Sequence, residues 1–411
     1  MSIFLLALYL FLAGTSLIST APLLFLRQPE TVTVLLMAAG LLFPLRGVIC
    51  LVLSWRRSGR PHRIDVFLCL AELLVGALFL CLPRFSQTAF FVALILYLSF
   101  WIAVKAIDTR IYARTRQWRY FVPSLVTAVC SADLFLFLLF SPVQLRKQTV
   151  AMVVAVLLVL FGLGLLCDFL GIAVKAPRFR RVVGSIRLAL PDFIGLLLPL
   201  HAVTAMRSEP LLEKRDENEV EVLFQVAERG IALAGHCELC IDGETLTYGC
   251  YEPQSRHLFR TVGGGVIIRA PREQYLRWCI RENGKKVISY TLRFPSEQMT
   301  LIRSQISDLE RRMEPWQPEV QAEEYASRIR AVDNVRFFRV TEGPFRTYFV
   351  PTINCVTITN WILEKTELGK AVMLGIKTPG AYLDFLERQY RSGSGIVMNR
   401  CVYDRDTAQE S

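Results

Sequence analysis

Residues 188–219 read LALPDFIGLLLPLHAVTAMRSEPLLEKRDENE and join two halves of opposite character. The sequence before them is a series of apolar runs, whereas the sequence after them alternates polar loops with short strand-like and helix-like segments. Residues 188–206 are long enough to cross a bilayer once. Because Asp192, His201 and two prolines weaken such a crossing, the alternative is a helix lying in the membrane interface. We expect a seventh span here, followed by a polar linker over residues 207–219.

Composition supports a membrane domain joined to one globular domain. The chain has 411 residues, of which 53% are hydrophobic, and this is too apolar for a single soluble domain. Up to Met206 there are 19 basic against 7 acidic residues, a net +12, and the remainder has 28 against 29. A nucleic-acid binder needs its basic patch on the folded domain. We therefore exclude nucleic acid as a partner and read the basic excess as a topology signal.

Six apolar runs precede residue 180, and each is close to the roughly 20 residues that span a bilayer. They cover about residues 3–20, 31–54, 65–83, 87–106, 120–141 and 149–173. Pro29, Pro83 and Pro142 each lie in the short loop inside a helical hairpin, and each following helix ends in a basic stretch. The repeat predicts an all-α multi-span membrane domain built from three helical hairpins.

The basic stretches at residues 56–60, 110–119 and 175–181 also orient this domain. The positive-inside rule places them, with the N-terminus, in the cytoplasm. The layout of residues 1–180 resembles the HdeD-like family of small bacterial six-helix membrane proteins, which implies a multi-pass protein of the bacterial inner membrane. A seventh span would then carry the soluble domain outside the cytoplasm.

The soluble half begins with a predicted strand and hairpin. Residues 220–226 are strand-like, and residues 233–249 read LAGHCELCIDGETLTYG, which is a strand, a tight Asp-Gly turn and a second strand. His236 therefore opens a hairpin. Cys237 and Cys240 form a C-x-x-C pair, but positions i and i+3 of a strand point to opposite faces, so we expect no metal site there.

A second chemical signal is Asn354-Cys355, at the start of an apolar segment ending near Gly369. Asn354 is a good N-cap, so Cys355 should occupy the first helical turn. The positive end of the helix dipole and a neighbouring imidazole both favour the reactive thiolate. Free backbone N–H groups of the same turn could stabilise an oxyanion. A strand histidine with a cysteine at a helix N-terminus is the arrangement of papain-like thiol enzymes.

The order Gly-His and strand, Tyr-Gly, a Gly-rich segment, a strand and helix over 287–306, and Asn-Cys opening a helix resembles the Lnb-type periplasmic domain family. That family groups with the circularly permuted papain-like enzymes, such as lecithin:retinol acyltransferase-like proteins. The resemblance covers residues 220–390 and implies that Cys355 is the nucleophile and His236 the general base. Those acyltransferases have a second histidine about a dozen residues after the first. Tyr248 stands there in this chain, so either Tyr248 orients His236 or the role falls elsewhere.

Together these observations predict a membrane domain over residues 1–183, a possible seventh span or interfacial helix with a linker over 184–219, and an α+β permuted papain-like domain over 220–411. The expected function is a membrane-anchored thiol acyltransferase or hydrolase acting on a lipid or lipoprotein acyl group, without cofactor or metal. Membrane lipids or lipid-anchored proteins would be its partners. A cell-wall peptide amidase or endopeptidase, and a non-catalytic stress or scaffold protein, are the alternatives. Six cysteines in the soluble half, five of them besides Cys355, favour the cytoplasm for this domain, whereas the family resemblance favours the other side.

Overall fold

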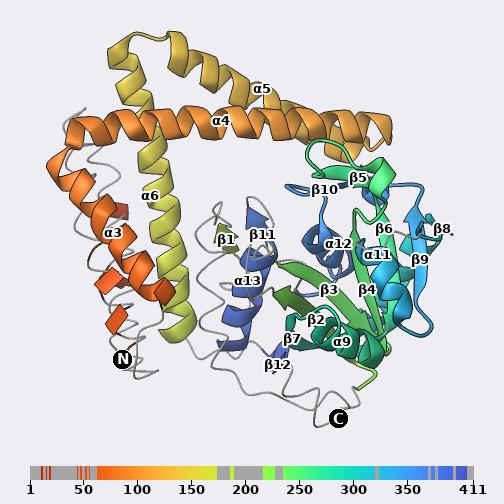
Figure 1. Ribbon diagram of the computed structural model, residues 1–411. Coiled ribbons are helices and arrows are strands. Elements are labelled where there is room, and N and C mark those ends of the chain that lie inside the picture. The colour runs from red at the N-terminus through yellow and green to blue at the C-terminus, as the bar shows by residue number, and fades with distance from the viewer. Residues whose placement is uncertain are drawn as a thin grey trace. The chain divides into compact units, whose positions relative to one another are not determined.

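The computed structural model in Figure 1 describes residues 63–173, 186–188, 216–226, 235–319, 324–368, 372–374, 378–391 and 395–404, with isolated positions between 11 and 55. The chain divides into a helical unit within residues 9–166 and a unit built around a large sheet, formed mainly by the residues that follow.

The described part of the first unit consists of long helices. Their bounds are α3 Arg63–Cys81, α4 Pro83–Arg114, α5 Trp118–Phe140 and α6 Val143–Ala173. Two segments are long and apolar enough to cross a membrane, Phe91–Arg114 within α4 and Trp118–Phe140, which is α5. Large apolar side chains on these helices are exposed, among them Leu96, Val126 and Phe140. Such surface is typical of helices that meet lipid or another apolar phase.

The prediction of an all-α multi-span domain with three helical hairpins is wrong. Over the described residues only two helices pass as spans, and the largest assembly in the chain is an antiparallel sheet of eight strands. A shorter apolar stretch, Cys69–Leu78, lies within α3. Apart from isolated positions, the first two predicted runs lie outside the described residues, as does most of the predicted seventh span.

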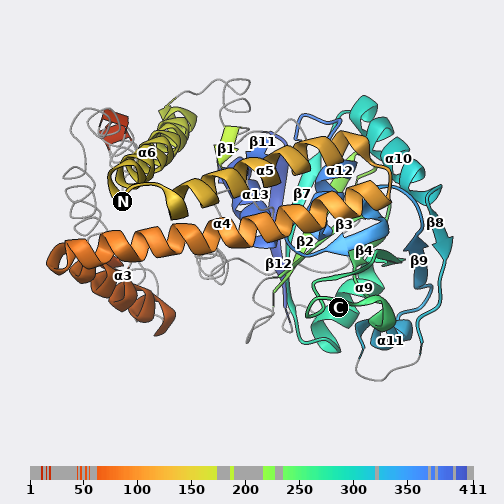
Figure 2. The same ribbon diagram turned by 90° about the horizontal axis from the view of Figure 1, so that it is seen from above.

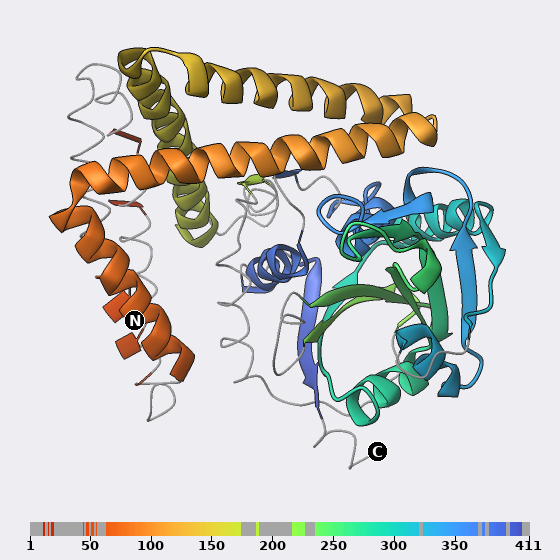
Figure 3. The same cartoon turned by 45° about the horizontal axis from the view of Figure 1, so that its top comes forward.

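The second unit contains the sheet. Its strands are β2 Glu219–Val226, β3 His236–Ile241, β4 Glu244–Gly249, β6 Val266–Pro271, β7 Lys286–Arg293, β8 Met313–Pro315, β9 Arg336–Val340 and β12 Val397–Tyr403. They are ordered β12-β7-β2-β3-β4-β6-β9-β8, and Figure 3 shows the sheet curling. Two small pairs lie outside it, β1 Ile186–Leu188 with β11 Val372–Leu374, and β5 Val262–Gly264 with β10 Thr347–Phe349. Strands β2, β3 and β4 are central and buried, so side chains on them are held rigidly.

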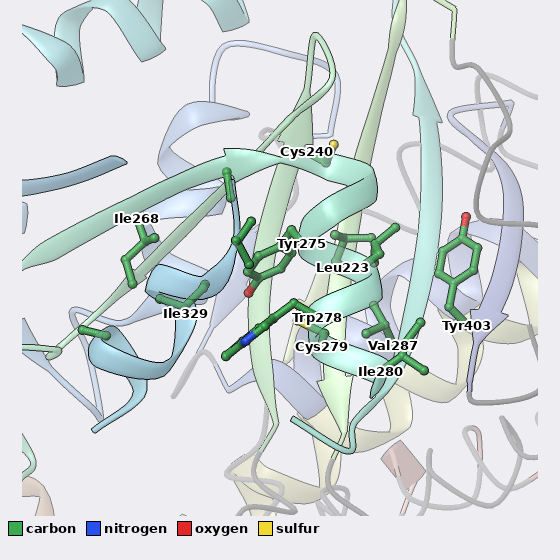
Figure 4. Packing of buried hydrophobic residues seen from close by; sticks show 14 of the residues in the cluster. Leu223, Cys240, Ile268, Tyr275, Trp278, Cys279, Ile280, Val287, Ile329 and Tyr403 are labelled. Carbon is green, nitrogen blue, oxygen red and sulfur yellow. The ribbon is translucent and has the colours of Figure 1, made fainter. Parts of the chain in front are cut away.

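Helices cover both faces of this sheet. They are α9 Arg272–Arg281, α10 Ser296–Glu310, α11 Tyr325–Arg328, α12 Cys355–Ile362 and α13 Pro379–Arg391, with the 3₁₀ turns η2 Pro253–Ser255, η3 Ile329–Ala331 and η4 Pro344–Arg346. Helix α9 contacts β4, β6 and β7, whereas α12 contacts β3 and β4 and lies beside α13 (Figure 2). The α9 side is a core in which Tyr275, Trp278 and Cys279 pack against Leu223 and Cys240 (Figure 4). Residues of β3 and β4 that project on one face therefore lie on the α9 side, and those that project on the other face lie on the α12 side.

The register of the β3–β4 hairpin determines which residues share a face. Asp242 and Gly243 form its two-residue turn, and both have positive φ, 50° and 78°, as the primed turns of hairpins require. The register pairs Ile241 with Glu244, Cys240 with Thr245 and Leu239 with Leu246. Directly paired residues share a face and neighbours alternate, so continuing this register puts Thr247 on the face of Glu238 and His236. Tyr248 falls on the opposite face with Cys237.

Candidate functional site

Cys355 is the first residue of α12, as the sequence predicts. The Asn354 side chain accepts a hydrogen bond from the Thr357 N–H at 3.1 Å and donates to the Val350 carbonyl at 2.8 Å, so it caps the helix and ties it to the preceding loop. The Cys355 thiol is buried, with 3% of the residue exposed, and its Sγ accepts from the backbone N–H of Cys237 at 3.5 Å. Because β3 pairs with β4 only over residues 239–241, this N–H lies where the two strands separate.

His236 directly precedes Cys237 and is the first residue of β3. Its Nε2 lies 2.7 Å from Thr247 Oγ1 and 3.1 Å from the Tyr251 hydroxyl, and these two hydroxyls are 2.9 Å apart. Both contacts use Nε2, so in the tautomer that donates from Nε2 the Nδ1 lone pair is available as a base. The fold thus brings Cys355 and His236 to adjacent positions. The thiol itself contacts the backbone beside His236, and contacts between catalytic groups are often long without substrate.

Tyr248 does not occupy the orienting position considered from the sequence. Its side chain is fully buried on the other face of β4, and its hydroxyl donates to the Phe345 carbonyl at 2.9 Å. Thr247 and Tyr251 contact the imidazole instead. A Cβ on Gly249 would lie 2.7 Å from the Tyr251 ring, so glycine at this position allows the ring to fold back towards His236.

A buried carboxyl lies behind the imidazole. Glu238 Oε1 is 3.9 Å from His236 Nε2, and the Glu238 side chain is fully buried. The same oxygen accepts from Gln225 Nε2 at 2.8 Å and from the Tyr275 hydroxyl on α9. The other oxygen, Oε2, is buried and has no hydrogen-bond partner among the described residues. An unsatisfied buried carboxyl oxygen is costly and uncommon in native proteins.

Burial sets the protonation of these groups. It lowers the pKa of His236 to about 4, and it raises the pKa of Glu238 to about 8, against hydrogen bonds from Tyr275, Thr247 and Gln225 that favour the carboxylate. Near neutral pH the imidazole is therefore neutral and Glu238 is largely protonated. Of His236 and Glu238, only the His236 side chain is accessible to solvent, with 23% of it exposed.

The expectation that the helix terminus makes Cys355 a thiolate is not met. Burial raises the pKa of Cys355 to about 11, although hydrogen bonds from the backbone N–H groups of Cys237, Val356 and Cys355 act in the opposite direction. Desolvation disfavours the charged form more than one short helix favours it. The resting pair is thus a neutral thiol and a neutral imidazole, and reaction requires proton transfer between them.

We expect Asn354→Ala to lower the free energy of unfolding by about 1 kcal/mol, because the first turn of α12 loses its cap. Asn354→Asp keeps the acceptor for the Thr357 N–H and should lose less. Chemical unfolding of the full chain in detergent, followed by fluorescence, measures both variants. Equal losses would show that the hydrogen bond to the Val350 carbonyl, and not the cap, is the stabilising contact.

The two shifted pKa values predict how stability depends on pH. Glu238 has a folded pKa raised from 4.5 to about 8, so the stability it contributes is present below pH 4.5 and is lost as pH rises towards 8. His236 has a folded pKa lowered from 6.5 to about 4, so its contribution is present above pH 6.5 and is lost as pH falls towards 4. The two oppose each other between pH 4.5 and 6.5. Between 6.5 and 8 only Glu238 acts, and stability should fall by up to about 1.4 kcal/mol per pH unit.

Glu238→Gln should remove this fall. Unfolding free energies of wild type and variant, measured at half-unit steps from pH 6 to 9, test it. A wild-type slope that persists in Glu238→Gln would assign the pH dependence to another group.

Several residues of this site were not singled out from the sequence: Gln225, Glu238, Thr247, Tyr251, Tyr275 and Tyr325. For Thr247 and Glu238 a signal existed, because the Asp-Gly turn fixes which residues of the hairpin share a face with His236. Tyr275 and Tyr325 come from α9 and α11, and their hydroxyls are 3.0 Å apart. They meet the strands only through tertiary packing, and in sequence α9 has the apolar stripe of any core helix.

The described residues contain no cluster of three or more His, Cys, Asp or Glu side chains that could hold a metal ion. Cys237 and Cys240 diverge, since Cys237 Sγ approaches Thr359 Oγ1 of α12 at 3.8 Å and Cys240 lies in the core on the α9 side. No protein-family model matches the chain, and neither a curated protein nor a solved structure matches it significantly.

Proposed function

We propose that the sheet-containing unit is a thiol acyl-transfer domain, in which Cys355 is the nucleophile and His236 the general base. The observation that carries the proposal is the meeting of an N-capped, helix-initial Cys355 with the backbone directly after His236, whose Nε2 is held by two hydroxyls. The thiol lies against the backbone next to His236, and the proposal requires the imidazole to reach the thiol when a substrate is bound.

The reaction divides into two balanced steps. His236 Nδ1 takes the thiol proton as Sγ attacks an acyl carbonyl, and the leaving oxygen or nitrogen departs with that proton, so that a thioester forms on Cys355. A hydroxyl, amine or water then gives its proton to His236 and attacks the thioester, which returns the thiol. The backbone N–H groups of Cys237, Val356 and Cys355 act on the thiol and are the proposed donors to the developing oxyanion.

Two features support a lipid or lipoprotein acyl group as the substrate. The same chain carries two helices long and apolar enough to cross a membrane, which would keep the domain close to acyl lipids. The rim near the α12 N-terminus is apolar as well. The Val350 N–H donates to the Thr261 carbonyl at 3.0 Å, and the neighbouring Leu258, Phe259 and Val350 are exposed, Phe259 completely. Exposed apolar groups of this kind mark contact with apolar partners.

The proposal is tested by trapping the thioester. The full chain in phospholipid vesicles is incubated with a phospholipid carrying a radiolabelled acyl chain, or in a second arm with a labelled diacyl lipopeptide. We expect a protein-bound label that hydroxylamine releases, and that Cys355→Ala abolishes but Cys401→Ala, a buried cysteine on β12, retains. A third arm with a cell-wall muropeptide tests peptide cleavage. Label that persists in Cys355→Ala, or no turnover in any arm, would overturn the proposal.

A further inference from the structure

Glu238 is a buried ionisable group beside His236 that the two-step scheme does not use. It sits on β3 two residues after His236 and therefore on the same face of the strand. Its Oε1 faces Nε2 of the imidazole at 3.9 Å, while Gln225 and Tyr275 donate to that oxygen from β2 and α9. The carboxyl is thus fixed from three elements and directed at the edge of His236 that Thr247 and Tyr251 also contact.

A structural role alone does not explain an acid at this position. A glutamine could accept the hydrogen bonds from Gln225 and Tyr275 through its carbonyl oxygen, without an ionisable group in an apolar core. The carboxyl instead leaves Oε2 without a hydrogen-bond partner among the described residues. A buried group that lacks partners on one oxygen and faces a histidine suggests an electrostatic role.

We propose that Glu238 is a positioning residue of the Cys355–His236 pair, whose carboxylate form stabilises the imidazolium that appears when the thiol loses its proton. This inference rests on the proposed function. When His236 is protonated at Nδ1, its positive charge spreads to Nε2, next to Glu238 Oε1 and Thr247 Oγ1. A carboxylate there makes His236 a stronger base, whereas a protonated carboxyl does not.

The site should therefore gain activity as Glu238 ionises. Burial raises the pKa of Glu238 to about 8, which puts this change within the working range of a thiol enzyme. The Glu238 carboxylate also raises the pKa of the Cys355 thiol, but its effect is smaller than that of burial and than those of the Cys237 and Val356 N–H groups. The titratable groups near the carboxyl are His236 and Cys237 on β3, Tyr251 before η2, Tyr275 and Cys279 on α9, Tyr325 on α11, and Cys355 on α12.

The experiment measures the rate of Cys355 alkylation by iodoacetamide from pH 5.5 to 9.5 in the full chain, for wild type and Glu238→Gln. The modified cysteine is quantified by mass spectrometry, and Glu282→Gln, an acidic-residue change at the exposed end of α9, is the matched control. We expect the ratio of wild-type to Glu238→Gln rates to rise from about one at pH 6 to about tenfold at pH 9, as a charge pair near 4 Å permits. The control ratio should stay at one throughout.

Tyr275→Phe provides a second reading that does not depend on the glutamine variant folding. It removes a donor that favours the Glu238 carboxylate, so the inflection near pH 8 should move to higher pH. A purely structural role for Glu238 would scale the rates equally at every pH and leave the inflection in place. A flat wild-type to Glu238→Gln ratio, with Cys355 still reactive and dependent on His236, would overturn this inference alone. An unreactive Cys355 in the wild type would instead remove the proposed function.

Discussion

His236→Ala is expected to slow alkylation of Cys355 at pH 7 by about 100-fold or more. Burial raises the pKa of Cys355 to about 11, so without a base only about one thiol in 10,000 is ionised at this pH. The neutral imidazole, whose Nε2 is held by Thr247 and Tyr251, supplies the base, and a positioned general base typically contributes 10²- to 10⁴-fold. Mass spectrometry of peptides after timed iodoacetamide labelling measures the rate at Cys355 separately from the other cysteines.

His257→Ala is the matched control for this prediction. His257 lies in the loop before β5, where its backbone pairs with that of Val262. The proposed reaction does not use its side chain. Cys355→Ser gives the background of the remaining cysteines. If His236→Ala and His257→Ala label Cys355 at the same rate, the imidazole does not act on the thiol, and the domain is better treated as a binding module than as an enzyme.

The hairpin shows how far sequence reasoning reaches at this site. The Asp242-Gly243 turn and the two strands were predicted, and both are confirmed. Tyr248 was considered because the acyltransferases that the sequence resembles have a second histidine at a similar spacing from the first one. The two-residue turn pairs Ile241 with Glu244, and continuing this register pairs Cys237 with Tyr248. Paired residues share a face and neighbours alternate, so the register would have put Tyr248 on the face away from His236.

Helices were predictable where the spacing of apolar residues and the capping residues indicated the same segment. The strand and helix expected over residues 287–306 are β7 and α10, although α10 continues to Glu310. Asn354 caps α12, but the helix ends at Ile362, well before Gly369, near which the apolar segment ends. Local signals thus mark where a helix begins, while its length depends on tertiary packing that the sequence does not display.

The N-terminal half was predicted less well. Every apolar run near 20 residues was interpreted as a span, but over the described residues only two helices are long and apolar enough to cross a membrane. Apolar composition alone does not distinguish a span from a buried helix. The electrostatics of Cys355 were misjudged because its burial could not be assigned before the fold was known.

Arg272→Met is expected to destabilise the sheet-containing unit by about 3–5 kcal/mol. Arg272, at the start of α9, donates through Nε and Nη2 to both carboxylate oxygens of Glu221 on β2, and the Nη2–Oε1 distance is 3.0 Å. Glu221 also accepts from Ser289 at 2.8 Å, Arg272 donates to the Tyr403 hydroxyl at 2.9 Å, and both ionic side chains are buried. Removing one partner leaves a buried, uncompensated charge, and this accounts for the size of the loss.

Thermal unfolding of the full chain should show this loss as a fall in Tm of roughly 10 °C. Arg303→Met is the matched control, because it breaks the ion pair between Arg303 and Asp242. Their side chains are 43% and 50% exposed, respectively, so this change should cost less than about 1 kcal/mol. In Arg272→Met combined with Glu221→Leu the stranded charge is absent, so much of the stability should return. If the double variant were as unstable as Arg272→Met, the loss would come from the contacts of Arg272 with β12 and not from the unpaired carboxylate. The pair would then hold α9 in place by packing, and the positions of Tyr275 and Glu238 behind His236 would depend on that packing.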